Sequence, residues 1–147
     1  MHFVLDQNFP FQATGLPWPP ALTVSPLRAI DPDLTSDHDD WEIFRALHDR
    51  GGIDGFITND ASLLNLAREM VMLSRTQIIL VVTAGLLMLH LPQIAKQQHP
   101  RPCIYTLKRP KLQLTNVRST VDALAAQAGL TPAALMRREI AEIERTP

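Results

Sequence analysis

The stretch IILVVTAGLLMLHL, residues 78–91, decides the fold. Its first five residues are β-branched or apolar without interruption, which predicts a buried strand over residues 78–82. A turn follows, and residues 86–97 then predict a helix with a kink or late start at Pro92. The whole run is shorter than the roughly 20 residues of a membrane-spanning helix and is interrupted by Thr83, Gly85 and His90. We therefore expect a strand, a turn and a helix, and no membrane segment.

The same alternation extends in both directions from this stretch. Apolar runs predict further strands at His2–Leu5, residues 21–24, Gly55–Thr58 and Cys103–Leu107, the last of these being the final strand. Helical spacing predicts helices from about residue 40 to a stop at Gly51–Gly52, over residues 61–74, over 117–128 and from Thr131–Pro132 to about residue 145. We interpret residues 7–20 as a proline-rich loop and residues 26–35 as irregular. Strands that alternate with helices predict a three-layer α/β/α fold with a short central parallel sheet.

The composition suits a single domain. The chain has 147 residues, of which 46% are hydrophobic, enough for one buried core. We expect one domain over residues 1–147, with an α/β core at 1–115 and C-terminal helices at 116–147. The single cysteine, Cys103, makes no internal disulfide, and the first residues lack the pattern of a secretory signal. We therefore expect a cytoplasmic protein.

Acidic and basic residues are segregated along the chain, although the net charge is only -1. Nine of the fifteen acids lie between residues 31 and 60, whereas six basic residues and no acid lie between residues 96 and 118. The segregation is typical either of two ordinary solvated faces or of an acidic metal site beside a phosphate-binding surface. On the second interpretation, RNA would contact four basic residues: Arg101, Lys108, Arg109 and Lys111.

Three aspartates are placed so that they converge. Asp6 directly follows the first predicted strand, Asp60 follows the strand Gly55–Thr58, and Asp40 begins the helix that leads into that strand. If the two strands are parallel neighbours, all three residues emerge at the carboxyl edge of the sheet, where α/β proteins bind ligands. A carboxylate cluster suits Mg²⁺ or Mn²⁺, which activates water for attack on a phosphodiester. Each aspartate taken alone is equally typical of a turn or a helix cap.

Three segments together resemble a known family. FVLDQNFP (3–10), SDHDDWEIFRAL (36–47) and FITNDASLL (56–64) are similar in order and spacing to the opening strand, helix start and Thr-x-Asp segment of compact PIN-like domains, relatives of the Mut7-C group and of VapC-type toxins. The resemblance covers residues 1 to about 85. It implies metal-dependent cleavage of RNA by a catalytic, metal-binding triad of Asp6, Asp40 and Asp60.

The resemblance also implies supporting residues and partners. Asn8 and Thr58 would orient ligands or water through hydrogen bonds, and Asn59 lies inside the Thr-x-Asp segment. Members of the family commonly act as the toxin of a toxin–antitoxin pair and commonly form homodimers, so an RNA substrate, an antitoxin protein and a second copy of the chain are the expected partners.

The chain also departs from the family pattern. Larger relatives carry a further acid on a central helix, and here Asp37, Asp39, Glu42 and Asp54 are alternatives for it. Ser62–Leu63 replaces the family's usual ending after Asp60, so a catalytically inactive RNA- or protein-binding module is the main alternative. A phosphatase or receiver-like domain with Asp6 as nucleophile is a second alternative, in which Lys108 would be the late lysine.

Overall fold

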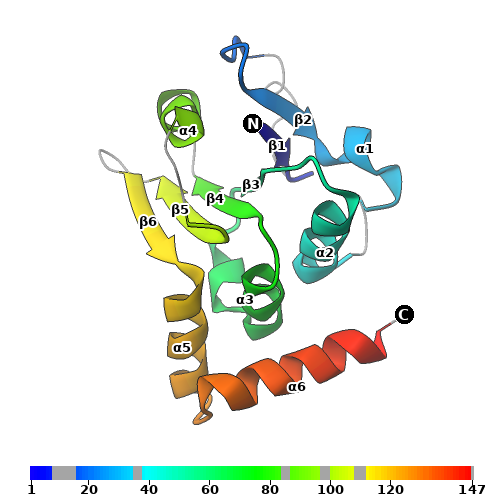
Figure 1. Ribbon diagram of the computed structural model, residues 1–147, viewed down its shortest axis with the longest axis vertical. Helices are drawn as coiled ribbons and strands as arrows, with labels where there is room; N and C mark the ends of the chain where they lie inside the picture. Colours follow the sequence, from blue (N-terminus) through cyan, green and yellow to red (C-terminus); the bar gives the residue numbers. More distant parts are fainter. Residues whose placement is uncertain (8–15, 35–37, 84–86, 97–99, 108–111, 147) are drawn as a thin grey trace.

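The computed structural model describes residues 1–7, 16–34, 38–83, 87–96, 100–107 and 112–146. These residues form one six-stranded sheet with helices on both faces (Figure 1), so the predicted three-layer α/β architecture is confirmed. The strands are β1 (His2–Leu5), β2 (Thr23–Pro26), β3 (Gly55–Thr58), β4 (Ile79–Thr83), β5 (Cys103–Leu107) and β6 (Leu112–Asn116). The α-helices are α1 (Leu27–Ile30), α2 (Asp40–Arg50), α3 (Ala67–Ser74), α4 (Leu87–Lys96), α5 (Val117–Gln127) and α6 (Pro132–Arg145), and two 3₁₀ helices are η2 (Pro32–Leu34) and η3 (Ala61–Asn65).

The strand order places a switch point at the first strand. The sheet runs β2-β1-β3-β4-β5-β6, with every neighbouring pair parallel except β5 and β6. From β1 the chain first adds β2 on one side and then returns to add β3 on the other side. In open α/β sheets the crevice outside the carboxyl ends of the two strands at such a reversal is the usual ligand site. The residues that directly follow β1 and β3 therefore lie where ligands bind in such sheets.

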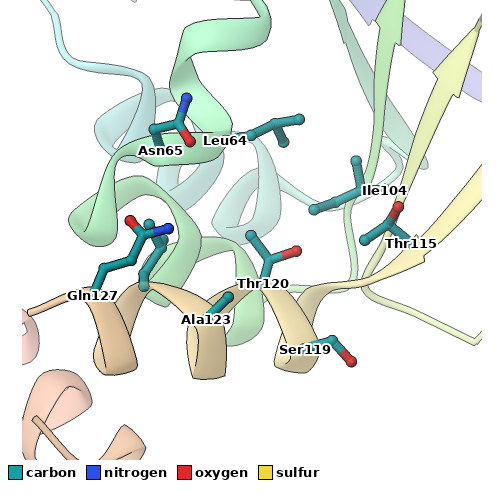
Figure 2. Close-up of a pocket in the computed structure, with 9 residues that line it drawn as sticks. Leu64, Asn65, Ile104, Thr115, Ser119, Thr120, Ala123 and Gln127 are labelled. Atoms are coloured by element: carbon teal, nitrogen blue, oxygen red, sulfur yellow. The ribbon is translucent and has the colours of Figure 1, made fainter.

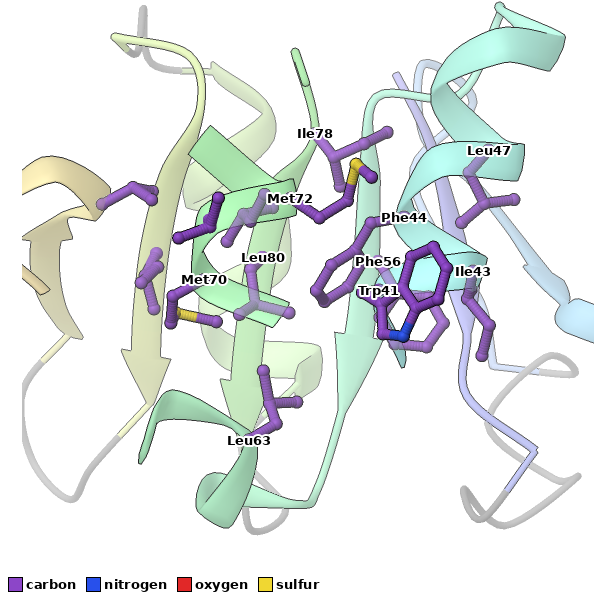
Figure 3. Close-up of a cluster of buried hydrophobic side chains, with 14 of the residues drawn as sticks. Trp41, Ile43, Phe44, Leu47, Phe56, Leu63, Met70, Met72, Ile78 and Leu80 are labelled. Atoms are coloured by element: carbon purple, nitrogen blue, oxygen red, sulfur yellow. The ribbon is translucent and has the colours of Figure 1, made fainter. Parts of the chain in front are cut away.

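One face of the sheet carries most of the helices. Alternate strand residues such as Val4, Phe56 and Leu80 point to this face and join a core with side chains from α2, α3, α5 and α6. Figure 3 shows the part of this core between the strands and α2 and α3, where Phe44 meets Phe56 edge-to-face with ring centroids 5.8 Å apart. Because α2 leads from β2 past β1 into β3, and α3 leads from β3 into its neighbour β4, this core fixes both helices against the sheet.

The opposite face is covered by α4. Phe3, Ile57 and Val81 alternate with the residues of the first face and pack with Leu91 and Ile94 of α4. The apolar run of residues 78–91 is thus divided between a buried strand and the first part of a helix, as predicted. None of the helices in the described residues is long and apolar enough to cross a membrane.

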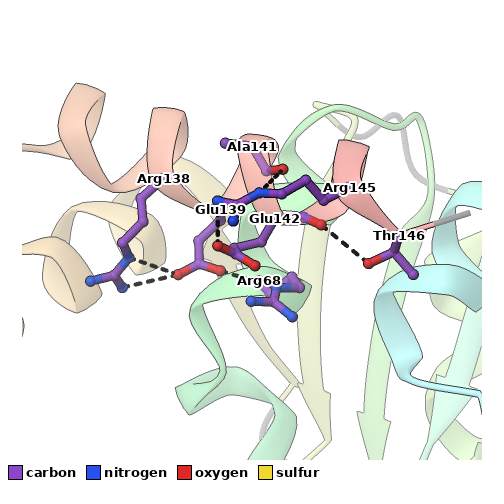
Figure 4. Close-up of polar contacts among 7 residues, drawn as sticks. All are labelled: Arg68, Arg138, Glu139, Ala141, Glu142, Arg145 and Thr146. Carbon is purple, nitrogen blue, oxygen red and sulfur yellow. Dashed lines mark hydrogen bonds and ion pairs between the residues drawn. The ribbon is translucent and has the colours of Figure 1, made fainter.

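A buried ion-pair network holds the last helix in place. Glu139 on α6 is only 6% exposed and accepts hydrogen bonds from Arg68 of α3 at 3.1 Å and from Arg138 at 3.0 Å (Figure 4). Leu135 and Ile143 of α6 are also buried in the first core. Charge-assisted bonds at a buried carboxylate are strong and directional, so they fix α6 against α3.

The structure also corrects three predictions. Cys103–Leu107 is not the last strand, because β6 follows it as an antiparallel neighbour. Residues 26–35 are not wholly irregular but contain α1 and η2. The helix predicted over residues 61–74 is divided into η3 and α3, since Leu66 has an extended backbone and ends the first helix. Local spacing does not distinguish one long helix from two short ones that pack on the same core.

Candidate functional site

Asp6 and Asp60 leave neighbouring strands at the carboxyl edge of the sheet. Asp6 is 7% exposed, and its carboxylate accepts a hydrogen bond of 2.9 Å from the hydroxyl of Thr58 at the end of β3. The same Thr58 hydroxyl accepts a hydrogen bond of 3.1 Å from the backbone N–H of Asp60. Thr58 thus ties together two segments that lie 52 residues apart. The parallel pairing of β1 with β3 brings them to one edge, as the sequence argument required.

The side chain of Asp60 also caps a helix. Its carboxylate accepts hydrogen bonds from the backbone N–H of Ser62 at 2.9 Å and from the hydroxyl of Ser62 at 2.5 Å. Asp60 is therefore the N-cap of η3, which is the structural role that an aspartate after a strand often has. Asp60 is exposed, so its carboxylate oxygens remain accessible to solvent and ligands.

Asp40 is the first residue of α2, and α2 runs back along the sheet from the carboxyl edge. Asp39 precedes it as the N-cap and forms a capping box with Glu42, whose carboxylate accepts a 2.9 Å hydrogen bond from the Asp39 backbone N–H. The box fixes the start of the helix and so the position of Asp40. The caps use Asp39 and Glu42, leaving Asp40 as the acid of this turn without a capping bond.

A fourth acid, Glu69 near the start of α3, joins the group. Glu69 is only 8% exposed, although α3 is otherwise apolar on its buried side. Burial raises the pKa of Glu69 above its ordinary value, and Asp39 raises it further, while nearby Arg68 lowers it. Sequence reasoning missed this residue. The available signal was a glutamate three positions after Leu66 and four before Leu73, on the face of the helix that should be apolar.

These carboxylates repel one another. Partial burial raises the pKa of Asp40 from 3.8 to about 6, and the negative charges of Asp6, Glu69, Asp60 and Asp39 add to that rise. Like charges in a poorly hydrated site disfavour ionisation. Among the described residues, the charged side chains that shift the pKa of Asp40 most are all acids, so the main electrostatic contributions at Asp40 are repulsive. A raised carboxylate pKa beside further acids is typical of a functional site.

The donor set fits a hard divalent cation. Asp6, Asp40, Asp60 and Glu69 offer only carboxylate oxygens, the ligands that Mg²⁺ and Mn²⁺ prefer, and a cation would relieve the repulsion at Asp40. Among the described residues, no group of three or more acidic, histidine or cysteine side chains is already gathered around one point. Magnesium keeps several of its waters and needs few direct protein ligands, so one or two of these carboxylates suffice to hold it.

Two further residues from the sequence analysis lie at the opposite edge of the sheet. Arg101, expected to bind RNA, precedes β5 and forms a 2.9 Å ion pair with Asp54, which precedes β3. Residues that precede parallel strands lie at the amino edge, far from those that follow them. Arg101 therefore does not lie beside the acids, and Asp54 is not the further acid of this site.

The remaining predicted residues divide into two groups. Asn59 is exposed beside Asp60. Five of the others lie outside the described residues, namely Asn8, Asp37, Lys108, Arg109 and Lys111. Cys103 is buried, and burial raises the pKa of its thiol to about 11, which disfavours the reactive thiolate at neutral pH.

The site thus consists of Asp6, Asp40, Asp60 and Glu69 from four separate elements, with Thr58 between two of them. In comparisons with known proteins, no family model, no curated protein and no solved structure matched this chain.

Proposed function

We propose that the protein is a metal-dependent endoribonuclease whose carboxyl-edge acids bind Mg²⁺ or Mn²⁺. The observation that carries this proposal is the raised pKa of Asp40, caused by burial and by the charges of Asp6, Glu69 and Asp60. Acids that repel one another this strongly reduce stability and are retained when they bind a cation. The resemblance of three sequence segments to PIN-like nucleases supports RNA as the substrate.

Each residue has a distinct role in this proposal. Asp6, which is buried, and Asp40, which is half-buried, would hold the ion, and the exposed Asp60 would face the substrate. Thr58 holds the Asp6 carboxylate in one orientation through its 2.9 Å hydrogen bond. Glu69 would be a positioning acid, because its negative charge acts on Asp40 from α3. When bound, the ion supplies an activated water and neutralises charge on the phosphate.

Two observations favour the main alternative, an inactive binding module. The Asp60 carboxylate is already engaged with Ser62, and the described acids are not gathered around one point. A module of this kind binds RNA or protein without metal-dependent cleavage. The toxin role, an antitoxin partner, homodimerisation and a cytoplasmic location stay predictions of the sequence analysis.

The test is cleavage of labelled single-stranded RNA by the purified protein in Mg²⁺, Mn²⁺ or EDTA. We compare the wild-type protein with an Asp6→Asn/Asp60→Asn double variant and with Asp122→Asn, an exposed acid on α5 that serves as the matched control. Loss of an outer partner of a metal ligand costs about 10–100-fold, so loss of two direct ligands should cost at least about 100-fold. Asp122→Asn should retain full activity.

The outcomes separate the two functions. Metal-dependent cleavage that the double variant loses supports the nuclease. Cleavage that persists in EDTA or in the folded double variant contradicts it. If the RNA assay detects no cleavage and calorimetry detects no Mn²⁺ binding, while RNA still binds, the protein is the inactive binding module.

A further inference from the structure

A cavity of about 320 Å³ lies between η3, the β5–β6 pair and α5. Figure 2 shows Asn65 and Gln127 on one side of it and Ile104 and Thr115 on the other. Its volume is at the lower end of the range for small-molecule sites. None of the residues that line it has a role in the proposed function.

The cavity is lined by neutral groups. Leu64, Ile104 and Leu124 provide apolar surface, and none of the described residues that line the cavity is charged. The side chains of Asn65, Gln127 and Thr115 have no hydrogen-bond partner within the described part of the chain. The Thr120 hydroxyl donates to the backbone carbonyl of Asn116 at 3.3 Å and keeps its acceptor capacity. The lining therefore offers two carboxamides, from Asn65 and Gln127, and three hydroxyls, from Thr115, Ser119 and Thr120, beside apolar surface.

This combination matches one class of ligand, an unpaired nucleobase. A base has apolar faces and an edge of alternating donors and acceptors, which the carboxamides of asparagine and glutamine read with paired hydrogen bonds. Sequence-specific proteins bind single-stranded RNA by splaying such bases into pockets. An uncharged lining disfavours a phosphate, a carboxylate or a metal ion as the occupant, because none of these would find a compensating charge.

One short helix connects the cavity with the acids. Asp60 caps the start of η3, and Leu64 and Asn65 at its end line the cavity. Five residues of 3₁₀ helix extend about 10 Å, since each residue rises about 2 Å. That length is within the reach of one nucleotide or two neighbouring ones. A phosphate at the acids and a base in the cavity can therefore belong to the same short stretch of RNA.

We propose that this cavity is the base-binding subsite of the protein and selects the nucleotide beside the cleaved bond. The inference rests on the proposed nuclease function for its role in selection, whereas binding of a base needs no metal. The cavity residues thus set the nucleotide preference, and the acids carry out the cleavage.

The first experiment measures binding in EDTA, where no cleavage occurs. NMR spectra of the ¹⁵N-labelled protein are recorded with AMP, CMP, GMP or UMP, and with ribose 5-phosphate as the probe that has the sugar and phosphate but no base. At least one nucleotide should shift the amide signals of Asn65, Thr115 and Gln127, and ribose 5-phosphate should not. If no nucleotide shifts these signals, or if ribose 5-phosphate shifts them equally, the inference is wrong.

The second experiment uses an Asn65→Leu/Gln127→Leu variant, with Gln113→Leu on β6 as the matched control outside the cavity. Both positions of the double variant are exposed, so the fold should persist, which circular dichroism checks. The double variant should weaken nucleotide binding at least about tenfold, the effect of one lost paired contact to a base. In cleavage assays it should lose nucleotide preference but retain hydrolysis of bis(p-nitrophenyl) phosphate. A protein that binds nucleotides but cleaves nothing would contradict the proposed function alone, whereas cleavage with unchanged preference in the double variant would contradict this inference alone.

Discussion

The two edges of the sheet contain acids of the same type in opposite environments. At the amino edge, Asp54 accepts a 2.7 Å hydrogen bond from the backbone N–H of His2 and forms a 2.9 Å ion pair with Arg101. Partial burial raises its pKa, but those two contacts more than offset burial and hold the pKa of Asp54 below its ordinary value. At the carboxyl edge, burial and neighbouring acids raise the pKa of Asp40 to about 6.

The difference separates stability from function. At the amino edge every partner of Asp54 favours its ionised form, so the ionised aspartate stabilises the folded chain. At the carboxyl edge the neighbouring acids disfavour ionised Asp40, so the folded chain would be more stable without that charge. Destabilising groups that persist in a compact domain are typical of sites that bind or react. Substitutions at the two edges should therefore have opposite consequences.

The largest stability effect should come from the amino edge, at Gly55. A Cβ at this position would overlap the ring of buried Phe3 and lie 2.7 Å from the backbone carbonyl oxygen of Ile79. Because neither can move freely, Gly55→Ala should lower the free energy of unfolding by about 2–3 kcal/mol. Urea unfolding followed by the fluorescence of Trp41 measures this. Gly129→Ala is the contrast, because it has open space and only a left-handed φ of 69°, so its cost should be about 1 kcal/mol. An equal cost for both variants would contradict the close packing at Gly55.

A smaller loss should follow from Asp54→Asn. The variant weakens both the ion pair to Arg101 and the hydrogen bond from His2, which are partly exposed to solvent, so we expect about 1–2 kcal/mol. Because the folded-state pKa of Asp54 is lowered, its contribution is present above about pH 4 and is lost as the pH falls further. Urea unfolding of wild type and variant at pH 7 and pH 3 should show a smaller difference at pH 3 than at pH 7. RNA cleavage should be unchanged, and a loss of cleavage without a loss of stability would show that the two edges are coupled.

The smallest effect has the opposite sign. Asp40→Asn should raise the free energy of unfolding of the metal-free protein at pH 7 by about 1 kcal/mol, a value reduced from the full pKa shift because the residue is partly solvated. The folded-state pKa of about 6 lies above the unfolded value of 3.8, so the folded protein holds the extra proton between those values. Wild-type stability should therefore fall as the pH rises from about 4 to 6. In urea titrations with EDTA the variant should show a smaller fall, because only the raised pKa of Glu69 remains. A destabilised variant would disprove the repulsion.

The sequence predicted most of the framework, for a physical reason. His2–Leu5, Gly55–Thr58 and Cys103–Leu107 are strands with the predicted bounds, because uninterrupted apolar runs have few alternatives to a buried strand. β6 was missed, since it is an edge strand whose Gln113 and Leu114 are exposed and show no apolar run. Edge strands depend on their neighbour for pairing, which local sequence does not record.

The candidate site was predictable in part. Asp6 and Asp60 each follow a strand, and the parallel direction of the two strands is enough to predict that both lie at one edge of the sheet. The same rule places Arg101, which precedes a strand, at the other edge, although charge segregation had suggested a place beside the acids. Glu69 depends on how α3 packs against α2, and helix packing is a tertiary property that spacing in one helix does not determine.

The hydrogen bond from Thr58 to Asp6 also has a consequence for folding. Asp6 reaches Thr58 and the segment of Asp60 only after β1 has paired with β3, a contact that closes a loop of about fifty residues. Closing long loops is slow compared with forming helices and turns. A chain still leaving the ribosome, or one that has collapsed without this pairing, holds Asp6 apart from Thr58. The acidic site is therefore complete only in species in which β1 and β3 have paired.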